Sequence, residues 1–399
     1  MSARSARLSL SFSCVGHAFM HLFTALYAVV VLALEIDWRL SYHELIELWA
    51  LGSALVGFAA LPAGWLGDRW SAGGMMVVFF VGLGLSGILC SLVDTTLAMF
   101  IGLSAIGVFS AIYHPVGIAW LVRNAESRGK ALGVNGIFGP IGIAAGTLGT
   151  GALIDAYGWR AAFLVPGTLC LAVGLALWLC LRLGIVEEGG EDRRKDPPAS
   201  RGDMIRVFAV LLLTMFCMGL VFQGTQTVMP KLFDLRLRDI AGEGVFGIGA
   251  IVAGVYIVGG LFQIIGGHLA DRYPLKPIYF GAWALQVPVL LAIAAFGGYS
   301  LIAMAVLIVM LTAAPLPAEN MLLARYTPAH HRSLAYGVKF VLAFGSAPLA
   351  IWFAAFVQER TGEFAWLFTS MAALAALCML AVLLLPRERQ AAPAGVAAE

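Results

Sequence analysis

Twelve long apolar runs alternate with short polar segments along the chain. A run of about 20 apolar residues can cross the hydrocarbon core of a bilayer as an α-helix, because a rise of about 1.5 Å per residue gives about 30 Å. The predicted spans begin near Leu8, His43, Gly74, Leu97, Leu132, Ala161, Arg206, Val245, Lys276, Leu301, Leu334 and Glu363. The pattern therefore predicts an all-α membrane protein with twelve transmembrane helices.

The composition supports this prediction and excludes large soluble domains. Of the 399 residues, 61% are hydrophobic and only 12% are charged, whereas soluble domains carry about 25% charged residues. The 46 glycines favour closely packed helices over a membrane β-barrel, whose strands are short and alternating. A net charge of +2 without a basic stripe gives no sign of nucleic-acid binding.

The distribution of Lys and Arg predicts the orientation in the membrane. With the N-terminus inside, the cytoplasmic segments carry 18 of these residues and the outer segments carry six, and an excess of positive residues marks the cytoplasmic side. The first run, from Leu8 to Leu34, is too long for the apolar core of a signal peptide. We therefore expect a multi-pass protein of the cell (inner) membrane with both termini in the cytoplasm.

A polar stretch divides the chain near its middle. Residues 187–203 read EEGGEDRRKDPPASRGD, and a charge-rich segment with two prolines cannot bury enough apolar area to fold. We therefore expect a six-helix bundle over 1–186, a cytoplasmic linker over 187–204, a second six-helix bundle over 205–386 and a cytoplasmic tail over 387–399.

The two halves repeat each other. GWLGDRW at Gly64 to Trp70 returns as GHLADRY at Gly267 to Tyr273, and His114-Pro115 aligns with Leu316-Pro317 at nearly the same offset. Such agreement indicates duplication of a six-helix unit, which predicts two pseudo-symmetric bundles. Internal repeats around a site at the bilayer midplane are typical of secondary transporters.

These motifs resemble those of the major facilitator superfamily over most of the chain. GWLGDRW is similar to the loop motif that follows the second span in that family, with Gly67 in place of an alanine. The resemblance implies a conformational gate built from Gly64, Asp68 and Arg69 and from their counterparts Asp271 and Arg272. It implies that Asp68 pairs across the interface between the halves. The alternative is a simple tight turn.

The fifth span contains NGIFGPIGIAAG, from Asn135 to Gly146. This segment resembles in part the Gly-Pro motif of antiporters in the superfamily. The alternative is that Asn135, Gly139 and Pro140 serve helix packing, with a kink at the proline. We assign these three residues to helix packing.

Histidines lie inside two of the predicted spans, and His17 and His114 each lie nine residues from the cytoplasmic end of their span, at a similar depth. GHAFMHLF carries His17 and His21 four residues apart, and FSAIYHPVG places Tyr113 and His114 in the fourth span. Both segments are similar to the fosmidomycin resistance group of drug exporters, which implies export of a small molecule. Buried ionisable groups are costly in a membrane, so each is a functional candidate. His17, His21 and His114 are either a titrating triad in the substrate path or structural histidines bonded to neighbouring carbonyls.

Two further sets of polar residues lie within the spans. Gln223 and Gln226 lie three residues apart in the seventh span, on the face expected to meet the histidines. Glu319, beside Asn320, lies about 9 Å inside the tenth span, and Lys339 lies about 10.5 Å inside the next. Two antiparallel neighbours would bring Glu319 and Lys339 together. The pair is then either a structural ion pair or a proton-coupled switch, and we also group Lys339 with the conformational gate.

The sequence carries no enzyme signature. His17 and His21 have the spacing of a zinc-protease helix, but the glutamate that would act as base is missing, and no CxxC pair occurs among the six cysteines. We therefore expect no enzymatic activity, no cofactor and no metal. The favoured function is proton-coupled export of a small molecule by a monomer that works by alternating access. Proton-coupled uptake of a small organic anion is the alternative, and a non-transporting receptor or scaffold is a third.

Overall fold

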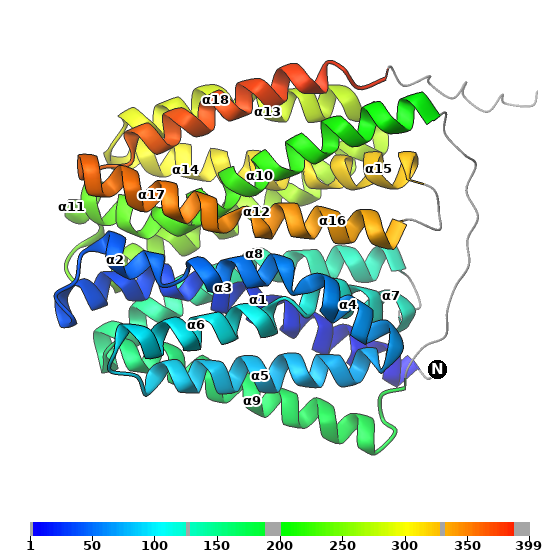
Figure 1. Ribbon diagram of the computed structural model, residues 1–399, viewed down its shortest axis with the longest axis horizontal. Coiled ribbons are helices and arrows are strands. Elements are labelled where there is room, and N and C mark those ends of the chain that lie inside the picture. Colours follow the sequence, from blue (N-terminus) through cyan, green and yellow to red (C-terminus); the bar gives the residue numbers. More distant parts are fainter. Residues whose placement is uncertain (1–2, 125–127, 188–200, 328–331, 387–399) are drawn as a thin grey trace, which may run out of the picture.

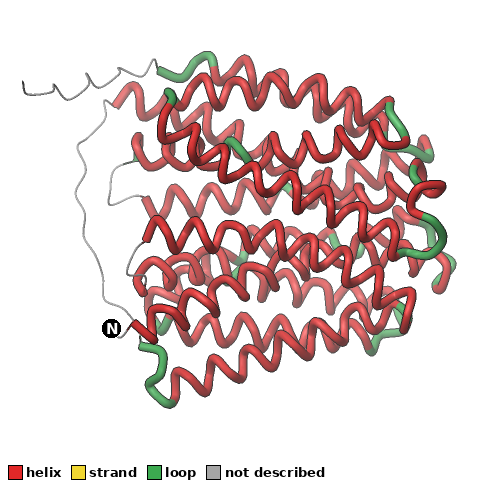
Figure 2. Tube along the Cα trace, turned by 180° about the vertical axis from the view of Figure 1, so that it is seen from behind, coloured by secondary structure: helices red, strands yellow, loops and turns green. Residues whose placement is uncertain are grey.

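The computed structural model describes residues 3–124, 128–187, 201–327 and 332–386. Within these ranges the chain is helical and contains no strand (Figure 2). Twelve helical segments are long and apolar enough to cross a membrane. Each begins within four residues of a predicted start, so the predicted fold class is confirmed.

Long apolar runs form these helices because a helix satisfies its own backbone hydrogen bonds where water is absent. The elements of the first half are α1 (Ala3–Asp37), α2 (Tyr42–Glu47), α3 (Ala50–Phe58), α4 (Ala60–Arg69), α5 (Ala72–Ser91), α6 (Thr96–Ser110), the π-helix η1 (Tyr113–Gly117), α7 (Ile118–Asn124), α8 (Arg128–Tyr157) and α9 (Trp159–Arg182). Those of the second half are α10 (Arg201–Arg236), α11 (Arg238–Ala241), α12 (Phe246–Arg272), α13 (Leu275–Ala295), α14 (Gly298–Ala313), α15 (Leu316–Tyr326), α16 (Arg332–Gly345), α17 (Ala347–Thr361) and α18 (Ala365–Val382).

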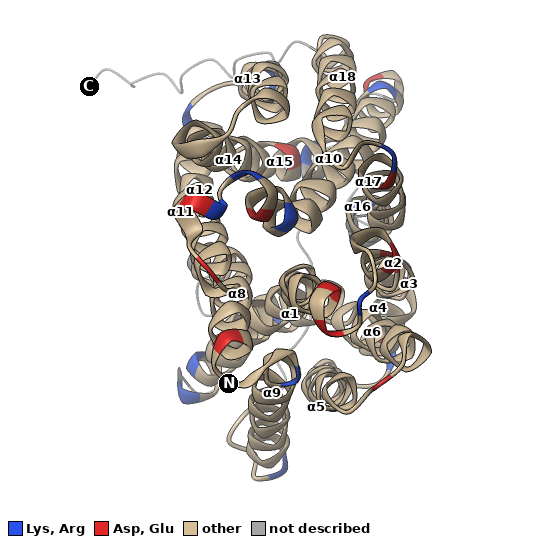
Figure 3. Cartoon of the chain, turned by 90° about the vertical axis from the view of Figure 1, so that its left-hand side faces the viewer, with Lys and Arg blue, Asp and Glu red and all other residues tan. Residues whose placement is uncertain are grey.

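The helices form two groups that lie side by side. Helices α1 to α9 make up one group and α10 to α18 the other (Figures 1 and 3). They meet where α8 packs against α12, α1 against α10, and α3 against α16. The start of α1 and the end of α18 lie at one end of the bundle (Figure 1), which we name the terminal end. Most of the predicted linker and the whole predicted tail lie outside the described residues.

Two spans are interrupted at matching places in the two halves. The fourth span is α6, η1 and α7, and its helix changes to a π turn at Tyr113–Gly117, where Pro115 has no N–H to donate. The tenth span breaks between α14 and α15, with Pro315 capping α15. Paired interruptions of this kind in repeated halves are the common mark of a substrate site in transporters, and π turns occur frequently at functional sites.

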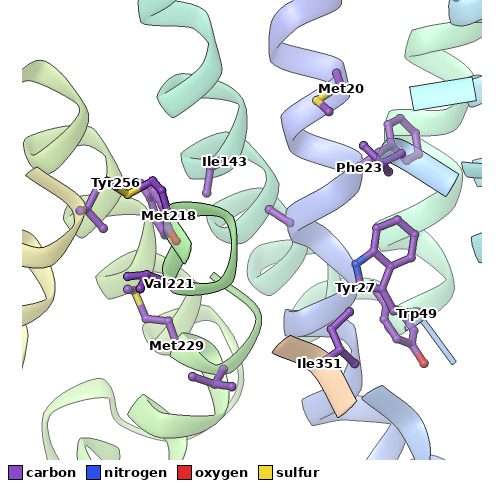
Figure 4. Packing of buried hydrophobic residues seen from close by; sticks show 14 of the residues in the cluster. Met20, Phe23, Tyr27, Trp49, Ile143, Met218, Val221, Met229, Tyr256 and Ile351 are labelled. Atoms are coloured by element: carbon purple, nitrogen blue, oxygen red, sulfur yellow. The ribbon is translucent and has the colours of Figure 1, made fainter. Parts of the chain in front are cut away.

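Close helix crossings depend on glycine. A Cβ atom on Gly107 of α6 would overlap the backbone carbonyl of Gly52 in α3, and one on Gly266 of α12 would overlap that of Ala314. Around such crossings lies a continuous apolar core. It contains Met20, Phe23 and Tyr27 of α1, together with Met218 and Val221 of α10 (Figure 4). Small residues let helices approach closely enough for this packing.

Exposed side chains on the flanks of the bundle are apolar, as a lipid-facing surface requires. Charged residues gather mainly near the ends of the helices (Figure 3). The Arg69 guanidinium lies 4.1 Å from the ring centroid of Trp65, and Arg160 lies 4.2 Å from that of Trp159. Tryptophan and arginine near span ends suit the membrane interface. The chain is therefore a multi-pass membrane protein.

Candidate functional site

Three histidines of the first half meet inside the bundle. The ring centroids of His17 and His21 on α1 are 5.0 Å apart, and those of His17 and His114 are 5.5 Å apart. One ring nitrogen of each histidine lies within 4.8 Å of the others. His17 and His21 are one turn apart on the same face of α1, and the π turn carries His114 to the same place. We refer to these residues as the histidine triad.

A hydrogen-bond network fixes one side of the triad. His17 Nδ1 donates to the backbone oxygen of Asn135, 2.8 Å away. The Asn135 amide in turn donates to the Tyr113 hydroxyl at 2.8 Å, and that hydroxyl donates to the Ser13 backbone oxygen at 2.8 Å. The rings of Tyr113 and His17 stack with centroids 5.0 Å apart. Tyr113 is therefore held by α1 and α8 and faces the triad.

The ring of His114 bridges the two halves. It stacks on Phe340 and Phe344 of α16, with centroids 4.9 and 5.0 Å apart. Both of its ring nitrogens are buried without a hydrogen-bond partner, as is Nδ1 of His21. An unsatisfied buried polar atom costs about 1–3 kcal/mol. The triad is thus a buried polar cluster with ring nitrogens that can bind a ligand or a proton.

A second polar cluster lies in the other half. Lys339 Nζ is 2.6 Å from Glu319 Oε1 and donates to Asn320 Oδ1 at 2.6 Å. The Tyr279 hydroxyl donates to the other carboxylate oxygen of Glu319 at 2.7 Å. Glu319 is only 2% exposed and Lys339 7%. The sequence expectation that these two charges meet is therefore met in the structure, and Tyr279 of α13 completes the cluster.

A small pocket lies beside the triad at the meeting of the halves. Its lining includes His21 and Thr24 of α1 together with Gln223 and Gln226 of α10. The cavity volume is about 10 Å³, which is room for about one water molecule. The carbonyl oxygen of Gln226 is buried without a partner. The two glutamines therefore lie toward the histidine side, as their spacing predicts.

The residues of the expected gate are arranged differently from the expectation. Asp68 Oδ1 accepts a hydrogen bond from Arg123 Nη2 at 2.9 Å. Both residues belong to the first half, so this ion pair does not cross the interface as the resemblance implied. Gly64 lies against Pro115, whose Cβ would be 3.2 Å from a Cβ at that position, and Arg69 stacks on Trp65. The contacts of Asp68 with Arg123 and of Gly64 with Pro115 join α4 to the fourth span, whereas Arg69 and Trp65 both belong to α4.

The matching segment of the second half, Gly267 to Tyr273, is described only in part. Arg272 is the exposed last residue of α12, and the side chain of Asp271 lies outside the described part. Lys339, which the sequence analysis groups with the gate as well as with Glu319, lies in the buried cluster. A gating role for Asp271 and Arg272 stays a prediction.

The Gly-Pro segment of α8 packs against both halves. A Cβ at Gly139 would lie 3.1 Å from Nε2 of His17 and 3.3 Å from Cδ2 of His21. Pro140 fills the space in front of Gly260 of α12. Asn135 does more than pack, because its side chain and its carbonyl hold Tyr113 and His17.

At the end opposite the terminal end, described residues of the two halves make polar contacts with each other. Lys231 Nζ of α10 lies 2.7 Å from Glu35 Oε2 of α1. The carboxylate of Asp155, in the last turn of α8, accepts backbone N–H bonds from Val245 at 2.8 Å and Phe246 at 2.8 Å. These two residues begin α12, where the helix dipole favours an anion. We name this set, Glu35, Lys231 and Asp155 with its α12 partners, the far-end clasp.

The sequence of the chain matches a known protein family over most of its length. A model described as Major Facilitator Superfamily matches residues 13–253 and 237–399. The chain belongs to this superfamily. The family match, together with the similarity to solved transporters, shows that the chain is a membrane transporter of a small substrate and not an enzyme.

Two relatives of this chain carry names that describe different roles. The chain is 26% identical over 407 residues to the 4-hydroxybenzoate transporter PcaK of Pseudomonas putida, covering 90% of this chain and 88% of that one. It is 30% identical over 140 residues to a multidrug resistance protein B homolog of Mycobacterium tuberculosis. That match covers 33% of this chain and only a quarter of the relative. The finer resemblance to the fosmidomycin resistance group stays a prediction.

Solved structures share the fold at low sequence identity. A peptide transporter POT in complex with sulfate aligns with a TM-score of 0.77 at 13% identity, covering 95% of this chain and 94% of that one. A bacterial homolog of the human lysosomal transporter Spinster, inward-facing and occupied, gives 0.72 at 15%, covering 96% and 95%. A D-xylose-proton symporter gives 0.71 at 16%, covering 94% and 97%.

Four residues of this transporter's site escaped the sequence analysis: Ser13, Tyr279, Phe340 and Phe344. Ser13 lies one turn before His17 on α1, so helical spacing from a histidine was a usable signal. Tyr279, Phe340 and Phe344 lie in apolar stretches of α13 and α16. Nothing in such a stretch distinguishes an aromatic side chain that faces the site from one in the core.

Proposed function

We propose that this protein moves a small organic molecule across the membrane by proton-coupled alternating access, with export by antiport as the favoured direction. The two six-helix halves rock about the interface that contains the triad and the pocket. The transporter works as a monomer in the cell (inner) membrane, with both termini in the cytoplasm, as the excess of Lys and Arg at the terminal end suggests.

The buried ion pair of Glu319 and Lys339 carries this proposal. Two charges deep in a membrane protein are costly, so they are retained where they serve transport. Protonation of Glu319 removes the negative charge that neutralises Lys339, and it leaves the hydrogen bond from Lys339 to Asn320 as the remaining polar contact of this cluster between α15 and α16. One proton can therefore change the packing of two helices that border the interface.

Side chains of the first half and of α10, α15 and α16 form the rest of the substrate path in this proposal. His21, Gln223 and Gln226 line the pocket, and Phe340 and Phe344 offer flat apolar surfaces beside His114. His17, Tyr113 and Asn320 contribute to this path indirectly, because their hydrogen bonds hold neighbouring side chains in place. Such a mixture of aromatic and amide groups suits a small polar molecule with an apolar part.

Two lines of support favour export. The His-Pro segment and the histidine-bearing first span resemble drug exporters, and part of the chain is similar to a multidrug resistance protein homolog. Antiport requires that proton and substrate exclude each other. A substrate with a cationic or hydrogen-bond-donating group meets this requirement, because it competes with the proton for the carboxylate of Glu319.

The second candidate is uptake of a small organic anion by symport with protons. Lys339 is the observation that favours it. When Glu319 takes a proton, Lys339 is freed to bind a carboxylate, so proton and anion bind together and move in the same direction. The relative that covers 90% of the chain is named a transporter of 4-hydroxybenzoate, an aromatic carboxylate.

Reconstituted protein with a substrate panel tests the proposal and separates the two candidates. Proteoliposomes with an imposed pH gradient are loaded with cationic, neutral and anionic aromatic compounds. The proposal expects a pH-driven flux opposite to the proton flow for at least one cationic or neutral compound. Flux of an anion in the same direction as the protons supports the second candidate, and flux that ignores the pH gradient contradicts proton coupling in both.

A further inference from the structure

The histidine triad has the ligands of a metal site. One nitrogen from each of His17, His21 and His114 lies within 4.8 Å of the other two. A tetrahedral ion with metal–nitrogen bonds of about 2.0–2.1 Å separates its ligand nitrogens by about 3.3 Å. The three rings therefore need to close by at most about 1.5 Å to share one ion, which lies within the reach of small side-chain rotations.

His17 is oriented as a metal ligand is. Its Nδ1–H donates to the carbonyl oxygen of Asn135, so the neutral ring keeps its lone pair on Nε2. A second hydrogen bond of this kind, to a backbone carbonyl, almost always accompanies a metal-binding histidine and fixes its tautomer. Gly139 leaves space beside this Nε2, because a Cβ there would lie only 3.1 Å away.

The other two histidines have free nitrogens. Nδ1 of His21 and both ring nitrogens of His114 are buried without a hydrogen-bond partner. Phe340 and Phe344 cover the ring of His114, and the pocket beside His21 has room for about one water molecule. A metal ion would bind one nitrogen of each histidine, so that one of the two unpartnered nitrogens of His114 gains a partner, and the pocket leaves room for a fourth ligand.

We propose that His17, His21 and His114 bind a divalent transition-metal ion of the Zn²⁺ class. Three imidazoles with one open position form a known zinc ligand set, and imidazole suits Zn²⁺, Ni²⁺ and Cu²⁺, whereas Ca²⁺ and Mg²⁺ need oxygen ligands. The ammonium group of Lys339, in the other half, is neutralised by Glu319. The site stands on the triad's geometry and does not rest on the proposed transport function.

Metal binding to the purified full-length chain tests this assignment. The parent carries His330→Gln and His331→Gln, so that these two adjacent histidines cannot contribute to the binding signal, and has no affinity tag. Isothermal titration with Zn²⁺ alone is expected to show one ion per chain. His21→Gln, His114→Gln and Gly139→Ala each weaken binding at least tenfold, while the matched variants His43→Gln and His268→Gln leave it unchanged.

X-ray absorption on the Zn²⁺-loaded parent keeps the proposal testable even if a triad variant fails to fold. It counts the imidazole ligands directly, and the site predicts three. Fewer than three imidazoles, no stoichiometric binding by the parent, or equal binding by a folded variant that lacks all three triad histidines would overturn the assignment. Because the readout is binding, a failure of the transport experiments leaves the result unaffected.

Discussion

At the scale of single residues, the strongest interaction in the site is the one between Glu319 and Lys339. Their charged atoms are 2.6 Å apart, and both side chains are buried with further partners in Tyr279 and Asn320. Desolvation offsets much of the attraction in such a pair. The pair therefore adds little net stability while it is intact, and a large cost arises when one charge is left alone.

A double-mutant cycle on this pair tests that reasoning. Glu319→Gln and Lys339→Met are each expected to lower the free energy of unfolding by about 3–5 kcal/mol and to stop pH-driven accumulation of substrate, because each strands one buried charge. The double variant is expected to recover part of the loss. Unfolding in detergent and substrate flux are the two measurements, and strictly additive losses would show that the residues do not act as a unit.

Asp68 illustrates the opposite case at the same scale. Its partner Arg123 is in the same half, and the side chains are 70% and 32% exposed. Exposed ion pairs contribute about 0–1 kcal/mol. Asp68→Asn is therefore expected to change the free energy of unfolding by less than about 1 kcal/mol, as measured by thermal unfolding. A larger loss would show that Asp68 has a structural partner beyond Arg123.

The sequence predicted which polar residues meet, because depth along a span follows from residue count. His17 and His114 were placed at one depth, and so were Glu319 and Lys339, and each set is in contact. Counting along a helix does not give rotation about its axis relative to partners from other spans. For this reason Tyr279, Phe340 and Phe344 were not anticipated. The pairing of Asp68 across the interface was implied by the resemblance and not by residue counting, and the structure pairs Asp68 with Arg123 of the same half.

At the scale of elements, glycine decides how closely helices pack. Gly107 lies where α6 crosses α3, and a Cβ atom at this position would overlap the carbonyl oxygen of Gly52, so a side chain there has no free space. Gly149 of α8 has no atom within 4 Å of the place a Cβ would take. The two positions are chemically identical and differ only in their surroundings.

Substituting these two glycines gives a matched test. Gly107→Ala is expected to destabilise the protein by more than about 2 kcal/mol, because α6 and α3 must separate. Gly149→Ala is expected to be neutral or stabilising by about 0.5–1 kcal/mol, since alanine favours a helix interior over glycine. Thermal unfolding in the same detergent compares them, and equal effects would contradict the crossing described for α6 and α3.

Span positions were predictable because hydrophobic length alone sets them. The interruptions were only partly visible. Pro115 and Pro315 mark them in the sequence, but the π turn at Tyr113–Gly117 depends on how His114 packs against α1 and α16. A local pattern does not contain that tertiary contact.

At the scale of the whole molecule, the far-end clasp holds the halves together on one side. Glu35 and Lys231 pair with side chains that are 21% and 12% exposed, and Asp155 caps α12 from the other half. The second carboxylate near Lys231 is Asp234, at 3.4 Å. A transporter that alternates must break such contacts when this end opens.

Loosening the clasp is expected to open that end. Glu35→Gln should raise the labelling rate of a pocket cysteine, Thr24→Cys, from the far side several-fold, since loss of about 1–2 kcal/mol shifts two populations by about tenfold. The matched control is Asp94→Asn, which breaks an exposed ion pair with Arg160 inside the first half. Equal labelling in Glu35→Gln and the control would show that the clasp does not keep this end closed.

The measurement that tests the account most directly is a comparison of net transport with exchange in the Glu319→Gln variant. If Glu319 carries the proton, a permanently neutral side chain lets the loaded carrier alternate but breaks the link to the pH gradient. The variant is expected to exchange labelled for unlabelled substrate at close to the parent rate, and it is expected not to accumulate substrate against a gradient. The control variant Glu359→Gln, on the exposed face of α17, is expected to behave as the parent in both assays. Accumulation driven by the pH gradient in Glu319→Gln proteoliposomes would contradict it.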